Sequence, residues 1–165
     1  MSEYVEMFSE IRRFQPVPWG LIPDIGLYMD QVITLMGRLY APLYGQDVKR
    51  FLSAPMINNY VKARLIPRPA GKKYSREQIA LLVMIVALKQ VCSMEDIRRL
   101  ITPGEGQTVE DLYESFCRRF HQSLQTLSAE PKEAADPALD LAIRAAACRA
   151  CCDAALAAGE KPIAE

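Results

Sequence analysis

Residues 53–80 read SAPMINNYVKARLIPRPAGKKYSREQIA and contain two helix starts separated by a break. Ser53 is suited to cap the first helix, which Pro67 is expected to end. Gly71 permits a tight turn, and Ser75 then begins a second helix. The stretch therefore predicts a helix, a hairpin-like tip and a further helix, and we interpret the rest of the chain around these three elements.

The first of these helices is predicted to be amphipathic. On a helical wheel its apolar side chains share one side, while Asn58, Asn59 and Lys62 fall on the other. An asparagine amide can bond an adenine edge with two hydrogen bonds, and a lysine can reach guanine or a phosphate. Ordinary surface helices also present such faces, so that alternative stays open. The apolar side consists of Met56, Ile57, Tyr60 and Val61.

The same region holds a local excess of positive charge. Residues 49–76, called the basic segment below, contain eight Lys or Arg and no Asp or Glu, although the whole chain has 20 residues of each sign. A positive block within an otherwise acidic chain is typical of a surface that meets an anionic partner. The alternative is a charged face that is simply solvated.

Caps and apolar periodicity predict further helices on both sides of the basic segment. A capping box of Ser75 and Gln78 precedes the run ALLVMIVAL, which is apolar nearly all round and is therefore expected in the core. Residues 128–136 have the composition of a linker. The other helices are expected over residues 2–14, from Asp24 or Asp30 to about Tyr44, and over 93–101, 109–127 and 137–158. Two of them follow further expected capping boxes, Ser93 with Asp96 and Thr108 with Asp111.

Composition argues against several classes of protein. The chain has no run of 18 apolar residues, so no membrane span is expected, and its N-terminus lacks the apolar core of a signal peptide. The five cysteines are odd in number and have no framework spacing, which indicates reduced thiols and a cytoplasmic location. The sequence has neither a glycine-rich phosphate loop nor a G-x-S-x-G motif, so we expect no enzyme and no cofactor.

The order of elements around the basic segment resembles the DNA-binding domain of the mercury-resistance-regulator (MerR) type. In that family the recognition helix ends in I-R-Y-Y-E-R-x-G-L-L, the wing carries G-Y-R-x-Y-S, and a later helix carries G-F-S-L-x-E-I. These patterns fall on residues 57–66, 70–75 and 91–97. Asn58 stands where the family has a DNA-contacting Arg, and Arg64 stands where it has Gly. The resemblance implies a winged helix-turn-helix, but the family's base preference does not transfer.

A longer resemblance spans about residues 19–101. The runs LIPDIGLYMDQVITLM, MINNYVK, LIPRP, KKYSREQIALLVMI and LKQVCSMEDI are similar to a bacterial family catalogued as a domain of unknown function, family 1836. This resemblance implies membership in a family without a measured activity. The expected function therefore rests on the residues and on the MerR-like pattern.

With DNA as the partner, the position of each residue suggests its role. Asn58, Asn59 and Lys62 would face the major groove, and the cations around them would hold phosphates or enter the minor groove. Six phosphate contacts would give a log–log salt slope of about −5. Tyr74 could bond a phosphate or pack across the base of the hairpin. The expected phosphate contacts are Lys72 and Lys73 at the tip, with Lys49, Arg50, Arg68 and Arg76 around it.

The thiols form a second candidate site. Cys117 and His121, the single histidine, are four residues apart on one helix face, and the last predicted helix carries three more cysteines. A tetrahedral S/N metal site could form if these helices paired, and some MerR-type regulators sense metals through cysteines after the DNA-binding domain. Cysteines on an apolar helix stripe are often simply buried, and no metal is expected. The three further cysteines are Cys148, Cys151 and Cys152.

Together these patterns predict a mostly α-helical protein, a MerR-like winged helix-turn-helix with additional N- and C-terminal helices. Its expected parts are an N-terminal helix and arm (1–18), the winged helix-turn-helix domain (19–101), and a C-terminal helical region (102–165) that forms a homodimer. The expected function is sequence-specific binding of double-stranded DNA in transcriptional regulation. The alternatives are a protein-interaction adaptor without specific DNA binding, or a thiol- or metal-responsive sensor.

Overall fold

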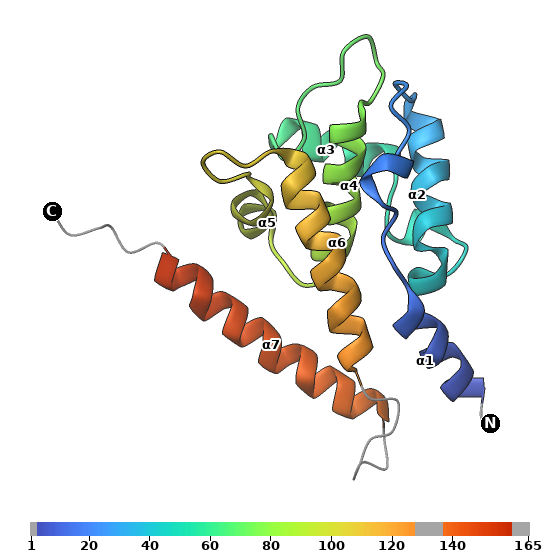
Figure 1. Ribbon diagram of the computed structural model, residues 1–165, viewed down its shortest axis with the longest axis vertical. Coiled ribbons are helices and arrows are strands. Elements are labelled where there is room, and N and C mark those ends of the chain that lie inside the picture. The colour runs from blue at the N-terminus through green and yellow to red at the C-terminus, as the bar shows by residue number, and fades with distance from the viewer. Residues whose placement is uncertain (1–2, 128–136, 160–165) are drawn as a thin grey trace, which may run out of the picture. The chain divides into compact units, whose positions relative to one another are not determined.

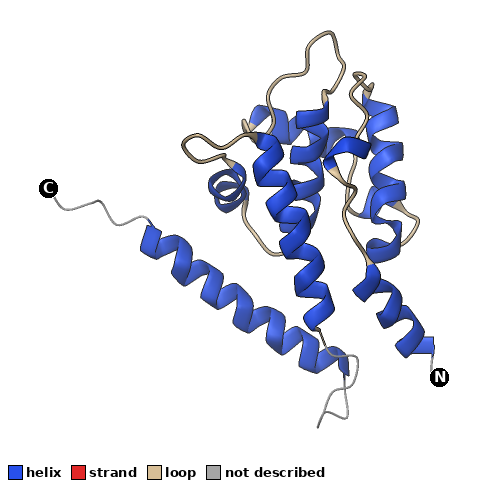
Figure 2. Ribbon diagram, viewed as in Figure 1, coloured by secondary structure: helices blue, strands red, loops and turns tan. Residues whose placement is uncertain are grey.

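The computed structural model describes residues 3–127 and 137–159, and these are mostly helical. Figure 2 shows helices joined by loops, and the described ranges contain isolated β-bridges but no strand. The mostly α-helical class is therefore confirmed. The elements are α1 (Glu3–Arg13), η1 (Trp19–Leu21), α2 (Met29–Tyr44), η2 (Val48–Arg50), α3 (Ala54–Lys62), α4 (Arg76–Leu88), α5 (Met94–Ile101), α6 (Val109–Thr126) and α7 (Pro137–Gly159), where η denotes a 3-10 turn (Figure 1).

Contacts along the chain divide it into two compact units, residues 1–127 and 128–165. In the first unit α6 packs on α4 and on α1, so the C-terminal region expected from residue 102 includes a helix of this first unit. The described part of the second unit is the helix α7, on which Leu139 and Ile143 are 58% and 60% exposed. The predicted linker lies outside the described residues. None of the described helices is long and apolar enough to cross a membrane.

Three helices start at the caps that the sequence predicts. Ser75 begins α4 with a capping box, in which Oε1 of Gln78 accepts a 2.7 Å hydrogen bond from the Ser75 amide. The hydroxyl of Ser93 accepts from the backbone of the third residue of α5. Thr108 and Asp111 form a second capping box at α6. These starts depend on groups three residues apart, which is why the sequence predicts them.

The start of α2 differs from the prediction. The helix begins at Met29 with Tyr28 as its N-cap residue, so neither Asp24 nor Asp30 caps it. Oε1 of Gln31 accepts a 2.9 Å hydrogen bond from the Tyr28 amide, which satisfies a donor that an aspartate cap would not reach. Asp30 instead lies in the first turn, where a carboxylate is favourable at the positive end of the helix dipole.

The end of α3 also differs, because the helix stops at Lys62, well before the Pro-rich break. The amide of Leu65 donates a 2.9 Å hydrogen bond to the carbonyl of Tyr60, and the amide of Arg64 donates to Val61 at 3.1 Å. This pair of bonds is a Schellman motif with Arg64 at the C′ position, where φ is +59°. A local left-handed residue therefore ends the helix, and the prediction that proline ends it was wrong.

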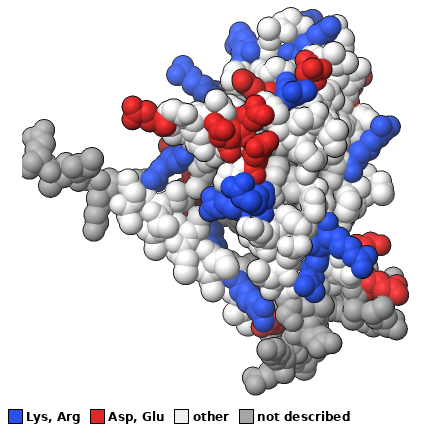
Figure 3. All heavy atoms as spheres, viewed as in Figure 1, with Lys and Arg blue, Asp and Glu red and all other residues white. Residues whose placement is uncertain are grey.

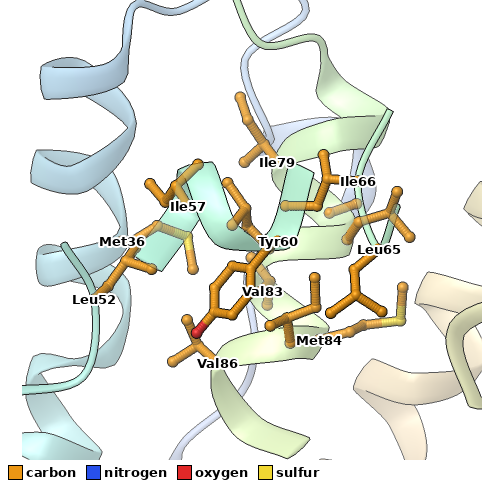
Figure 4. Packing of buried hydrophobic residues seen from close by; sticks show 14 of the residues in the cluster. Met36, Leu52, Ile57, Tyr60, Leu65, Ile66, Ile79, Val83, Met84 and Val86 are labelled. Atoms are coloured by element: carbon orange, nitrogen blue, oxygen red, sulfur yellow. The ribbon is translucent and has the colours of Figure 1, made fainter. Parts of the chain in front are cut away.

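The core is built around α4, in which residues 78–86 are all buried. Figure 4 shows Tyr60 reaching from α3 toward Val83 and Val86 of α4, while Ile57 lies on the side of Met36. Burial of each such side chain contributes about 1.5–3 kcal/mol relative to exposure. This packing holds one face of α3 against the core and leaves the other face to solvent.

The predicted hairpin-like tip projects beyond the helices (Figure 1). Gly71 and Lys72 have φ of +56° and +64°, and the amide of Lys73 donates a 3.0 Å hydrogen bond to the carbonyl of Ala70. Two central residues with positive φ are the property of a type I′ turn, which joins the arms of a tight hairpin. The turn therefore places two lysines at and beside the tip.

The base of the hairpin is held from two sides. Leu27, before α2, exchanges backbone hydrogen bonds of 3.0 and 2.8 Å with Tyr74. The amide side chain of Gln78, 6% exposed, donates a 2.8 Å hydrogen bond to the carbonyl of Pro67. Gln78 also belongs to the cap of α4, so the hairpin and α4 share one anchor.

Candidate nucleic-acid interface

The helix α3 presents to solvent the three polar side chains that the sequence predicts for base contact. Ile57 and Tyr60 are 0% and 3% exposed and hold the helix on the core. Asn58, Asn59 and Lys62 are exposed. Residues 58 and 62 are one helical turn apart and share a face, with residue 59 beside them. The exposed face of α3 therefore carries two amides and one ammonium, as the helical wheel predicts.

Arg98 of α5 fixes the C-terminal end of α3. Its Nη2 donates a 2.5 Å hydrogen bond to the carbonyl of Ala63, and its Nη1 lies 3.3 Å from Oε2 of Glu95. A cation at a helix C-terminus satisfies an orphan carbonyl and interacts favourably with the dipole. Sequence reasoning did not single out Arg98, because only the fold joins residues 35 positions apart.

The tip lysines remain exposed at the projecting end of the hairpin. Lys72 occupies the left-handed turn position, and Nζ of Lys73 lies 5.2 Å from the ring centroid of Tyr28. Figure 3 shows Lys and Arg side chains at the upper end, where the hairpin projects, and acidic side chains where α6 begins. Glu110 and Asp111 lie in that first turn of α6. The start of α6 is therefore acidic, whereas the hairpin end is mainly basic and has acidic side chains beside it.

Two of the expected phosphate contacts are engaged within the protein. Tyr74 is 2% exposed, and burial raises the pKa of its hydroxyl, which favours packing at the hairpin base over a phosphate contact. Nε of Arg76 donates a 2.9 Å hydrogen bond to the carbonyl of Ile22. The same guanidinium lies 5.8 Å from the Trp19 ring centroid and 3.7 Å from Oδ2 of Asp24. Arg76 therefore links the start of α4 to the segment around η1.

The remaining expected phosphate contacts are exposed cations. Lys49 and Arg50 lie on η2, which precedes α3. Lys62 and Arg68 line a common surface hollow of about 510 Å³, together with Arg64. Sequence reasoning did not propose Arg64 as a site residue. The sequence does carry one sign of it, since Arg64 stands at the position where the MerR-type pattern has Gly.

The predicted thiol site includes Cys117 and His121, and the structure engages both residues in ways that do not favour a metal. Nδ1 of His121 lies 2.8 Å from the carbonyl oxygen of Phe14 and must donate to it, which leaves Nε2 to accept from the amide of Gln15 at 3.2 Å. Burial raises the pKa of the Cys117 thiol, which keeps it protonated and a poor metal ligand. In the described ranges no group of three or more His, Cys, Asp or Glu is placed to hold a metal. Cys148, Cys151 and Cys152 lie on α7 in the second unit.

Comparison with known families places this surface inside a recognised domain. The sequence profile described as Domain of unknown function (DUF1836) matches residues 17–116. The chain belongs to this family. The DUF1836 domain extends from before η1 into α6, so it includes α3, the hairpin and Arg98, whereas α7 lies outside it. No curated protein and no solved structure matches the chain.

Proposed function

We propose that the chain binds double-stranded DNA as a MerR-like winged helix-turn-helix protein and regulates transcription. In this proposal α2 and α3 are the helix-turn-helix pair, and α3 is the recognition helix. The observation that carries it is the exposed face Asn58, Asn59 and Lys62 on a helix packed firmly against the core, within a basic segment without a single acid. An α-helix fits the major groove, which displays donors and acceptors that such side chains recognise.

The hairpin acts as a short wing in this proposal. A MerR-type wing contains strands, whereas this hairpin has the type I′ turn and the single bridges Ala70–Lys73 and Leu27–Tyr74. Positioning two cations does not require a long ladder of backbone hydrogen bonds between strands, because the turn and the anchored base already define the path of both arms. Lys72 and Lys73 would then contact the backbone beside the groove that α3 enters.

The exposed cations set the expected electrostatics. With Arg76 engaged inside the protein, the exposed phosphate contacts from the sequence number five, and they predict a log–log salt slope of about −4.5. These contacts orient the protein on the duplex but carry no sequence information. They are Lys49, Arg50, Arg68, Lys72 and Lys73.

Fluorescence anisotropy with labelled duplexes of varied sequence, over a series of salt concentrations, tests the proposal. The expected result is tight binding to a subset of duplexes, weak binding to the rest, and the salt slope above. A folded protein that binds no duplex at low salt would overturn it. Equal, weak binding to every duplex would instead favour an adaptor that docks an acidic partner on the basic surface.

Two variants separate base reading from phosphate contact. Asn59→Ala is expected to lower affinity for the preferred duplex by about 10-fold and to leave nonspecific binding unchanged, because a bidentate base contact discriminates by about 1–3 kcal/mol. Lys72→Ala is expected to weaken all duplexes alike and to reduce the salt slope by about 0.9. Lys89→Ala removes an exposed cation outside the basic segment and serves as the control. Identical effects of the first two variants would contradict the assigned roles.

We also propose that the chain is a homodimer that brings two copies of α3 to two half-sites. One short recognition helix reads few base pairs, so a second half-site is the usual solution. Leu139 and Ile143 are four residues apart on α7, share a face and are largely exposed, which provides an apolar surface for a second copy. In sedimentation experiments the double variant Leu139→Asp, Ile143→Asp is expected to be monomeric. A monomeric wild type, or a variant that still dimerises, would contradict this arrangement.

A further inference from the structure

The residue that ends α3 is unusual for its backbone conformation. Arg64 is the C′ residue of the Schellman motif, with φ of +59°. Glycine is the common residue at this position, because an L side chain is strained in the left-handed region. Within the described residues the Arg64 side chain has no hydrogen bond or ion pair that would compensate for this strain. An exposed arginine in a strained conformation therefore requires an explanation outside the folding of α3.

The surroundings of Arg64 supply such an explanation. Arg64, Lys62 and Arg68 line the hollow of about 510 Å³ between the end of α3 and the first arm of the hairpin. The rest of its lining is Val61, Ile66 and Pro67, so the hollow contains no acid. In the described part of the chain, none of the three cationic side chains has an ion-pair partner. Three uncompensated positive charges around one concavity suit a tetrahedral oxyanion.

The hollow lies at the C-terminal end of α3, and this position affects how an anion would bind there. The C-terminal end of a helix carries partial negative charge, which repels an anion placed there. Arg98 and the Schellman bonds already occupy carbonyls at this end, which reduces the repulsion. The three cations lie where they offset the repulsion that remains. A single lysine would not create a favourable anion site at this position, whereas the combination does.

We propose that Lys62, Arg64 and Arg68 together hold one backbone phosphate of the duplex, and that Arg64 is retained at C′ for this contact. Lys62 then contacts this phosphate in place of a base, and base contact from α3 is left to Asn58 and Asn59. The inference rests on the proposed DNA-binding function and adds to it a residue and a ligand group. Arginine can grip a phosphate through two parallel N–H groups. A phosphate held at the end of α3 sets how deeply Asn58 and Asn59 enter the groove, because phosphate contacts determine register on the duplex.

Arg64→Gly tests the assignment, because in this variant the stability of the protein is expected to rise while its affinity for DNA falls. Glycine removes the strain, so the melting temperature is expected to rise. Loss of the Arg64 contact is expected to lower affinity about 10-fold for every duplex. It should reduce the magnitude of the salt slope by a fraction of the roughly 0.9 that a whole phosphate contact contributes, because Lys62 and Arg68 still face that phosphate. Arg64→Asn, which also tolerates the left-handed region, is expected to lose the same affinity. Lys89→Ala is the charge control.

The outcomes distinguish this inference from the function on which it rests. If wild type binds selected duplexes and Arg64→Gly binds them with unchanged affinity and slope, the phosphate site is overturned and the DNA-binding function stands. A loss confined to certain sequences would make Arg64 a base-reading residue and would also overturn the phosphate site. If folded wild type binds no duplex at low salt, the proposed function fails and the phosphate site fails with it.

Discussion

The backbones of Leu27 and Tyr74 exchange two hydrogen bonds, which join the segment before α2 to the end of the hairpin. The approach is close enough that a Cβ placed on Gly26 would lie 2.8 Å from the Cβ of Lys73. Real Cβ atoms do not come this near to one another, so a side chain at residue 26 would push the two segments apart. The anchored base of the hairpin therefore depends on a glycine.

Gly26→Ala is expected to reduce the free energy of unfolding by about 1–3 kcal/mol, because the added methyl group forces the backbones apart. Urea denaturation measures the change. Gly20→Ala is the matched control, since a Cβ at that position meets nothing within 4 Å. Equal stability of the two variants would show that the close approach does not exist.

Removing the hydroxyl group from each of two buried tyrosines is expected to change stability in opposite directions. The hydroxyl of Tyr40 donates a 2.5 Å hydrogen bond to the carbonyl of Val83, whereas the buried hydroxyl of Tyr60 has no partner in the described residues. Tyr40→Phe is expected to cost about 1 kcal/mol, and Tyr60→Phe is expected to be neutral or to stabilise by up to about 1 kcal/mol. Thermal denaturation of both variants checks the signs, and a marked loss in Tyr60→Phe would reveal an unrecognised partner.

Arg98→Ala is expected to loosen the end of α3. The lost hydrogen bond to Ala63 should cost about 0.5–1.5 kcal/mol, and amide exchange of Arg64 and Leu65 should accelerate. Glu95→Ala removes the other partner of this guanidinium and leaves its bond to α3 intact. The same exchange behaviour in both variants would mean that the ion pair, and not the carbonyl contact, orders the helix end.

Alkaline pH is expected to destabilise the protein. Burial raises the pKa of Tyr40, Tyr60 and Tyr113 above the ordinary value of 10.0, so the folded state keeps these protons while the unfolded state loses them. Their contribution to stability is fully present below pH 10 and declines above it, by about 1.4 kcal/mol per pH unit for each tyrosine. Burial also raises the pKa of Cys117, and this loss begins near pH 9.0.

Chemical denaturation between neutral pH and pH 11 measures this dependence. Tyr113→Phe should flatten the slope above pH 10 by one proton, and it should also lose the 2.7 Å hydrogen bond to the carbonyl of Val17 at every pH. A variant whose slope matches that of wild type would show that Tyr113 ionises equally in the folded and unfolded states.

Local chemistry explains which parts of the fold were predictable. Ser75, Ser93 and Thr108 each act on a backbone amide three residues later, so the sequence alone predicts these helix starts. The end of α3 was missed because proline is the stronger signal in sequence, while the left-handed conformation was adopted by an arginine instead of a glycine. A helical wheel suffices to place Asn58 and Lys62 opposite the core.

Long-range contacts explain what could not be predicted about the candidate site. Arg76 appears in sequence as one more cation of the basic segment, yet its hydrogen bond reaches a carbonyl 54 positions away. Arg98 likewise meets α3 through the packing of α5. Neither pairing has a periodicity or spacing that marks it. The hollow around Arg64 also emerges only when α3 and the hairpin arm lie side by side.

The buried amide of Gln78 has a thermodynamic consequence. It bonds the start of α4 and the hairpin arm at once, at 2.7 and 2.8 Å, so the hairpin is ordered before any partner arrives. Little conformational entropy then remains for it to lose on association. If the chain binds duplex DNA as proposed, calorimetry should give a heat-capacity change that corresponds to the surface buried between two preformed partners. The additional heat-capacity change of a hairpin that folds on binding should be absent.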